Sequence, residues 1–111
     1  DFDAVIIGWS LGVDPDSYSI WHSSQYPKGL NFIKYNNPEI DKLLELGRTT
    51  MNKKERKKIY AKINKIISKD QPYIFLWYPK VVEGIRNRVG GLSKPGPAGP
   101  FLYIEKVFVK K

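Results

Sequence analysis

A short segment near the start of the chain carries residue types that can bind a ligand. Trp9 offers a ring face for stacking, and Ser10 with the neighbouring backbone groups offers hydrogen bonds. Both follow the β-branched apolar run Ala4–Ile7, which ends at Gly8 and is typical of a short buried strand. Sheets of the α/β class bind ligands beyond the carboxyl ends of their strands. We therefore expect Trp9 and Ser10 to contact a ligand, with the alternative that Trp9 only closes the edge of a core.

His22 is the single histidine of the chain, which also has no cysteine. A metal site would therefore have to consist mostly of carboxylates, and a Ser-His-Asp triad would have to use His22. Serines and aspartates lie near it in sequence, but no Gly-x-Ser-x-Gly nucleophile elbow, phosphate loop or dinucleotide-binding fingerprint accompanies them. We expect no catalysis, no metal and no cofactor, and we expect His22 to be a surface or hydrogen-bonded loop residue.

Lysine is concentrated in one stretch of a basic chain. The 111 residues contain 19 Lys and Arg against 11 Asp and Glu, which gives a net charge of +8. Eight of the basic residues fall between positions 53 and 69. Clustered lysines can neutralise the phosphates of a nucleic acid, but arginine is scarce here and the usual nucleic-acid modules are missing. We expect a solvated helix face and no nucleic-acid partner, and we keep a small nucleic-acid-binding module as the alternative function.

Two helices are predicted from their start signals and their apolar spacing. Asn37 can cap a helix whose first residue is a proline, and apolar residues then recur at helical spacing over 38–49. Asn52 begins a second helix over 53–69, which carries a capping-box glutamate and a stripe of isoleucines. An aspartate at position 14 or 16 could cap a further helical turn that runs to Trp21.

Apolar and aromatic runs predict the strands of a short mixed sheet. Four such segments are expected, at 4–7, 73–78, 81–85 and 101–111. Residues 93–100 are rich in proline and glycine and form an irregular connector. We therefore predict an α/β fold, in which a mixed short sheet is covered by two amphipathic helices, and we treat residues 1–111 as one piece of a larger domain.

The order of these segments resembles the C-terminal part of the extracellular solute-binding proteins that deliver oligopeptides and dipeptides to ABC importers. The most specific combination is the Asn-Pro-Glu-Ile-Asp helix start together with the Arg-x-x-x-Tyr pattern of the second helix. The resemblance extends over roughly positions 1 to 90. The matching residues are Asp1-Phe2-Asp3-Ala4, Gly8-Trp9, Asp14-Pro15, Tyr35 to Leu44, Glu55-Arg56, Ile59-Tyr60, Gln71 to Ile74 and Tyr78-Pro79.

This resemblance implies part of one lobe of a two-lobed, periplasmic-binding-protein-like fold that closes on its ligand by hinge motion. It implies non-catalytic binding of an oligopeptide, with the loop after the Gly-Trp pair lining the cleft and an aspartate pairing with the peptide amino terminus. The three residues after Trp9 depart from this pattern because none of them is acidic, and Asp14, the first acidic residue of the loop, could take this role. The ligand-binding residues implied are Trp9, Ser10, Leu11, Gly12 and Asp14. Another peptide-like or sugar-like solute is the alternative ligand.

Partners and location are also implied by the resemblance. The full-length protein would contact the membrane permease of an ABC importer, outside the cell or in the periplasm, while anchored to the membrane. Within this chain we expect no signal peptide and no transmembrane segment, because no apolar run approaches the roughly 18 residues that a membrane span needs. Exposed sheet edges would make the isolated piece self-associate.

Overall fold

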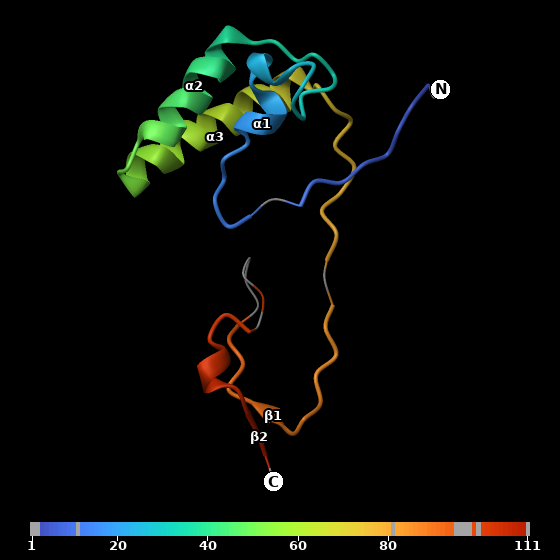
Figure 1. Cartoon of the computed structure of the whole chain (residues 1–111), viewed down its shortest axis with the longest axis vertical. Coiled ribbons are helices and arrows are strands. Elements are labelled where there is room, and N and C mark those ends of the chain that lie inside the picture. The colour runs from blue at the N-terminus through green and yellow to red at the C-terminus, as the bar shows by residue number, and fades with distance from the viewer. Residues whose placement is uncertain (1–2, 11, 81, 95–98, 100, 111) are drawn as a thin grey trace. The chain divides into compact units, whose positions relative to one another are not determined.

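The computed structural model describes residues 3–10, 12–80, 82–94, 99 and 101–110 (Figure 1). Residues 15–77 form one compact unit, which contains the three α-helices found among the described residues. The described residues of 1–14 and 78–111 form a second unit, which contains the two short strands. None of the described helices has the length and apolar character needed to cross a membrane.

The helices of the first unit begin and end close to where the sequence places them. They are α1 (Tyr18–Trp21), α2 (Pro38–Thr49) and α3 (Lys53–Asp70), and a 3-10 turn, η1 (Ser23–Gln25), follows α1. Both long helices start at the predicted caps. Asn37 Oδ1 accepts hydrogen bonds from two backbone N–H groups of α2, and Asn52 Oδ1 does the same for α3. The short α1 is also predicted, and Asp16 Oδ1 accepts a hydrogen bond from the backbone N–H of Tyr18 at 3.1 Å.

The core lies where α2 and α3 pack side by side and α1 closes over them (Figure 1). Its buried apolar residues are Ile20, Trp21, Ile40, Leu44, Tyr60, Ile63 and Ile67. Helix α2 approaches α3 closely at Gly47, where an added Cβ would lie only 3.0 Å from the ring of Tyr60. The isoleucine stripe predicted for the second helix is therefore the face that α3 buries.

Among the described residues, the two predicted amphipathic helices form, but the predicted mixed sheet is reduced to two short strands, so the α/β expectation is corrected to a mostly helical fold. The strands found in the described residues are β1 (Val89–Gly90) and β2 (Phe108–Val109), which pair antiparallel with Val89 opposite Val109. Residues 4–7 and 73–78 have no regular secondary structure, and neither do the described residues of 81–85. Ile6 is 78% exposed and Ile74 is 87% exposed. These segments have strand-like composition, but a strand also needs a hydrogen-bonding neighbour, and the described part of the chain supplies none.

The end of the chain is only partly extended. A 3-10 turn, η2 (Ile104–Lys106), precedes β2, so the terminal strand predicted for 101–111 is reduced to two residues among those described. The predicted connector at 93–100 falls largely outside the described residues, which include only 93, 94 and 99 of that stretch.

Candidate functional site

The predicted ligand-binding segment lies outside every helix and strand. Trp9, Ser10, Gly12 and Asp14 are all exposed and belong to the same compact unit, whereas Leu11 lies outside the described residues. Trp9 keeps 36% of its surface exposed and is not one of the buried core residues. A Cβ built at Gly8 or Gly12 would meet no atom within 4 Å, so a ligand can approach the backbone there. The segment therefore offers an accessible ring, a hydroxyl group and a carboxylate within six positions.

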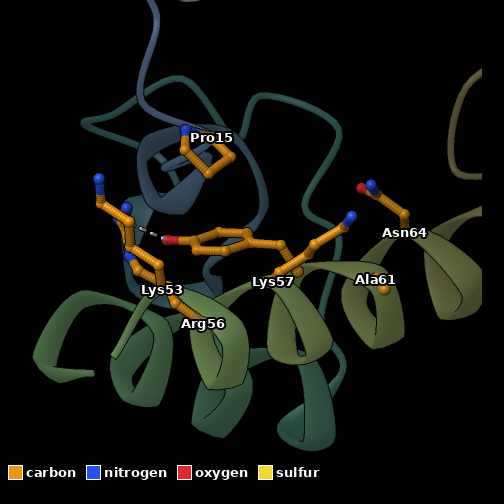
Figure 2. A pocket seen from close by; sticks show the side chains of 7 residues that line it. Pro15, Lys53, Arg56, Lys57, Ala61 and Asn64 are labelled. Carbon is orange, nitrogen blue, oxygen red and sulfur yellow. Dashed lines mark hydrogen bonds between the residues drawn. The ribbon is translucent and has the colours of Figure 1, made fainter. Parts of the chain in front are cut away.

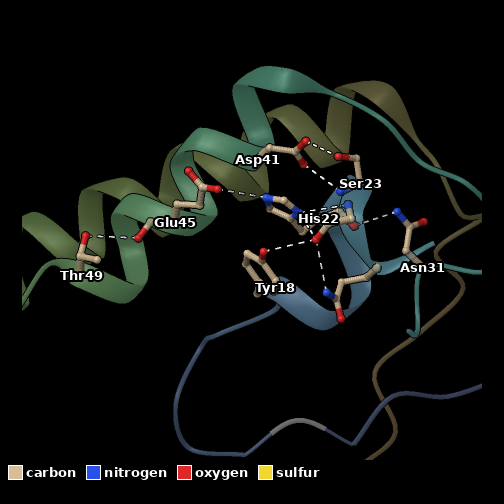
Figure 3. Close-up of polar contacts among 9 residues, drawn as sticks. Tyr18, His22, Ser23, Asn31, Asp41, Glu45 and Thr49 are labelled. Carbon is tan, nitrogen blue, oxygen red and sulfur yellow. Dashed lines mark hydrogen bonds and ion pairs between the residues drawn. The ribbon is translucent and has the colours of Figure 1, made fainter. Parts of the chain in front are cut away.

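His22 is buried at the centre of a cluster of polar side chains in the other unit (Figure 3). Its Nδ1 accepts a hydrogen bond from the backbone N–H of Ser24 at 3.1 Å and lies 2.8 Å from the hydroxyl oxygen of Ser24. Its Nε2 lies 3.5 Å from a carboxylate oxygen of Glu45, and its ring stacks on Tyr18 with 4.2 Å between the centroids. These contacts fix the imidazole between α1 and α2, and they confirm the expectation of a hydrogen-bonded histidine.

The serines around His22 are not arranged for nucleophilic catalysis. Ser23 donates its hydroxyl hydrogen to Asp41 at 2.6 Å and its backbone N–H to the same carboxylate at 2.9 Å, so the aspartate binds this serine rather than the imidazole. The hydroxyl oxygen of Ser24 lies 2.8 Å from Nδ1 of His22, and His22 is only 7% exposed. Among the described residues, no three His, Cys, Asp or Glu side chains gather as they would to hold a metal ion.

Asn31 holds the loop after η1 together, and it is not among the residues selected from the sequence. Its side chain is completely buried. The amide nitrogen donates to the carbonyl oxygens of His22 at 3.1 Å and Tyr35 at 2.8 Å, and the amide oxygen accepts from the backbone N–H of Tyr35 at 2.9 Å. A lone asparagine between Leu30 and Phe32 was the available signal, because a polar residue in an apolar stretch is often buried with hydrogen-bonding partners.

Tyr35 and Asp70 tie the start of α2 to the end of α3. The Tyr35 hydroxyl donates to Asp70 at 2.6 Å, and the side-chain amide of Asn37 donates to the same oxygen at 2.9 Å. Burial and then the hydrogen bond to the carboxylate raise the pKa of Tyr35 to about 12. The hydrogen bonds from Tyr35 and Asn37 lower the pKa of Asp70. The contact is structural, because it closes the helix pair opposite the α2–α3 turn.

A basic hollow of about 370 Å³ opens beside the first turns of α3 (Figure 2). Its apolar wall consists of Pro15, the ring of Tyr60 and Ala61, and its polar residues are Lys53, Arg56, Lys57 and Asn64. The guanidinium of Arg56 lies 5.1 Å from the ring centroid of Tyr60 and donates from Nε to the carbonyl oxygen of Gly47 at 2.8 Å. The basic residues of the hollow were expected on a solvated helix face, and no sequence pattern predicted that Pro15 lies beside them. The hollow is suited to an anion attached to an apolar body.

This chain is similar to several proteins that are named for peptide binding. No family profile matches the chain. It is 49% identical over 111 residues to the oligopeptide-binding protein AppA of Bacillus subtilis, covering all of this chain and 20% of the relative. It is 27% identical over 94 residues to a probable di/tripeptide-binding protein of Pseudomonas aeruginosa, covering 82% of this chain and 18% of the relative.

The solved structures agree with the sequence comparison. The structure of AppA from Bacillus subtilis in complex with a nonapeptide matches all of this chain and 22% of that chain, with a TM-score of 0.70 and 40% identity. A putative peptide-binding protein AppA from Clostridium difficile matches 84% of this chain and 19% of that chain, with a TM-score of 0.66 and 35% identity. The chain thus spans about one fifth of the length of its relatives. These relatives are binding proteins, in agreement with the expectation of a non-catalytic role.

Proposed function

Because this chain belongs to the AppA-like family of oligopeptide-binding proteins, we propose that it forms part of a protein that captures peptides for uptake by an ABC importer. The observation that carries this proposal is the 49% identity to an oligopeptide-binding protein over the whole of the chain. In the complete protein, the peptide would be enclosed between two lobes, and this chain would supply part of one lobe. Enclosure of the ligand provides most of the affinity in such a site, so the isolated chain would bind weakly.

Exposed apolar residues support a role within a longer protein. Large hydrophobic side chains are exposed in the segments with strand-like composition, including Val5, Ile6, Ile74, Leu76, Trp77 and Val82. A complete soluble protein rarely leaves so many apolar side chains uncovered in successive positions. The relatives are about five times as long as the part that matches. We propose that the remainder of such a protein supplies the neighbouring strands, and that these cover the apolar side chains.

The segment from Trp9 to Asp14 is the proposed peptide-contacting surface. The ring of Trp9 would pack on the peptide, and Ser10, Leu11 and Gly12 would supply the adjoining wall and backbone hydrogen bonds. A peptide ammonium group removed from water needs a carboxylate or several acceptors. Asp14 is the acidic residue of this segment and would provide the carboxylate. The open approach to the backbone at Gly12 and the exposure of Trp9 support this assignment.

Location and transport partner follow from the same proposal. One relative of this chain is named a periplasmic protein, the probable D,D-dipeptide-binding protein DdpA of Escherichia coli, with 30% identity over 94 residues. We propose that the complete protein works outside the cell or in the periplasm, attached to the membrane, and delivers its peptide to the membrane permease of the importer.

Calorimetric titration of the longer protein with a nonapeptide tests the proposal. Trp9→Ala should weaken binding by about 2 kcal/mol, roughly 30-fold, because aromatic anchors dominate such contacts. Trp9→Phe is the matched variant that keeps a ring and should retain most of the affinity. Asp14→Asn should weaken binding of the free peptide and leave binding of the N-acetylated peptide almost unchanged. Unchanged affinity in Trp9→Ala would refute the assigned surface, and no binding of any peptide would refute the function.

A further inference from the structure

The exposed half of α3 is covered with lysines. At about 100° per residue, seven lysines fall within roughly half of the helix circumference, opposite the buried stripe that contains Ile63 and Ile67. All seven are exposed. The remaining residues within the same arc are small or polar, and none is acidic or aromatic. We call this surface the lysine face; it consists of Lys53, Lys54, Lys57, Lys58, Lys62, Lys65 and Lys69.

Most of this charge is not neutralised by acidic neighbours. Among the described residues, Lys62 is the one member of the lysine face that forms an ion pair, with Glu39 at 2.6 Å. The two acidic residues of α3, Glu55 and Asp70, fall outside the lysine-bearing arc. Asp70 is also occupied by hydrogen bonds from Tyr35 and an asparagine. The lysine face therefore presents at least six positive charges along a helix about 27 Å long.

The basic hollow continues the lysine face at its beginning. Lys53 and Lys57 belong to the lysine face and also line the hollow. They lie one turn apart on α3, so their side chains leave the same side of the helix. Figure 2 shows the amino groups of Lys53 and Lys57 at opposite ends of the hollow, and the ring of Tyr60 also lines it. A phosphate group could pair with either amino group while its apolar attachment packs against the proline and tyrosine rings. The head groups of a membrane can contact many lysines of the lysine face at once, and one head group can enter the basic hollow.

We propose that the lysine face docks the protein on the anionic head groups of a lipid membrane. The inference rests on the proposed function, which places the protein beside a membrane. The stripe with Ile63 and Ile67 is buried against the rest of the core, so α3 would adsorb on the surface and not insert into it. A nucleic acid fits less well, because the lysine face itself has no arginine for bidentate contacts and no aromatic side chain for stacking. In the adjoining hollow, Arg56 donates from Nε to the carbonyl oxygen of Gly47 and Tyr60 is buried.

Vesicle binding by the 111-residue chain tests this proposal. Vesicles of phosphatidylcholine with about one third phosphatidylglycerol should bind the chain, while vesicles of phosphatidylcholine alone should not. Each lysine near an anionic surface contributes roughly fivefold in affinity, so Lys54→Gln/Lys58→Gln/Lys65→Gln should weaken binding on the order of 100-fold. Added salt should weaken the binding of the unaltered chain.

The matched control removes the same number of charges elsewhere. Lys28→Gln/Lys34→Gln/Lys42→Gln changes three exposed lysines outside α3 and should reduce vesicle binding by less than tenfold. An equal loss in both triple variants would overturn the proposal, because net charge alone would then explain binding. Tighter binding to a short DNA duplex than to the vesicles would overturn it in favour of a nucleic-acid surface. Peptide affinity of the longer protein should be the same with and without the α3 substitutions, so failure of docking and failure of peptide binding are distinguishable.

Discussion

Removal of the Asn31 side chain should destabilise the helical unit by about 3 kcal/mol. The side chain is completely buried and makes three hydrogen bonds of 2.8 to 3.1 Å to the backbone of His22 and Tyr35. A net contribution of about 0.5–1.5 kcal/mol for each bond gives this total for Asn31→Ala. The loss is large because a domain of this size is stable by only about 5–15 kcal/mol.

The assay is urea denaturation of the 111-residue chain followed by helical circular dichroism, since the three α-helices in the described part of the chain lie in the same unit. Asn31→Asp keeps the side-chain shape but places a second oxygen against two carbonyl oxygens, so it should cost at least as much as Asn31→Ala at neutral pH. Asn36→Ala, at an exposed position nearby, is the control and should change stability by less than about 0.5 kcal/mol. If Asn31→Asp is as stable as the unaltered chain, the three hydrogen bonds do not hold this loop.

Three further predictions concern packing, pH and association. Gly47→Ala should lower the free energy of unfolding in urea by about 1 kcal/mol, because the new methyl group would lie 3.0 Å from the Tyr60 ring and this strain exceeds the gain in helix propensity. Equal or greater stability of the variant would contradict the close packing of α2 on α3. Because the pKa of Tyr35 is raised to about 12 in the folded chain, its contribution to the free energy of unfolding is fully present below pH 10 and is lost as the pH rises towards about 12. Tyr35→Phe should remove this loss in denaturation curves measured across that range. The 111-residue chain should self-associate at micromolar concentration in sedimentation velocity experiments, because apolar side chains such as Ile74 are exposed. A strictly monomeric chain would argue against this exposed apolar surface.

The helices could be predicted from the sequence because their signals are local. Asn37 and Asn52 each make the predicted cap within three residues of their own position, and the buried stripe of α3 repeats at helical spacing. These features depend on neighbours one or two turns away, which the sequence displays directly.

The strands could not be predicted in the same way because pairing is a long-range property. Residues 4–7 have the composition of a buried strand, yet Val5 and Ile6 are exposed, since no described segment pairs with them. Composition reports the environment that a residue would suit and not the presence of a partner. The basic hollow was missed for the same reason, because it arises where Pro15 meets Tyr60, 45 positions along the chain.

The polar networks could be predicted in part, less completely than the helices but better than the strands. His22 was expected to be hydrogen-bonded, but its stacking on Tyr18 and its contact with Glu45 depend on how α1 packs against α2. Asn31 makes its three hydrogen bonds to the backbone of His22 and Tyr35, and the conformation of the loop between these residues could not be predicted from the residue types. Side-chain chemistry limits what each residue can do, and the fold decides which of these contacts is made.

The structure of the longer protein with a bound oligopeptide would test the central claim most directly. The account predicts that the peptide lies against the indole ring of Trp9 and that the carboxylate of Asp14 is within hydrogen-bonding distance of its amino terminus. A peptide bound at a distance from residues 9–14, or a Trp9 ring packed wholly inside the protein, would contradict it.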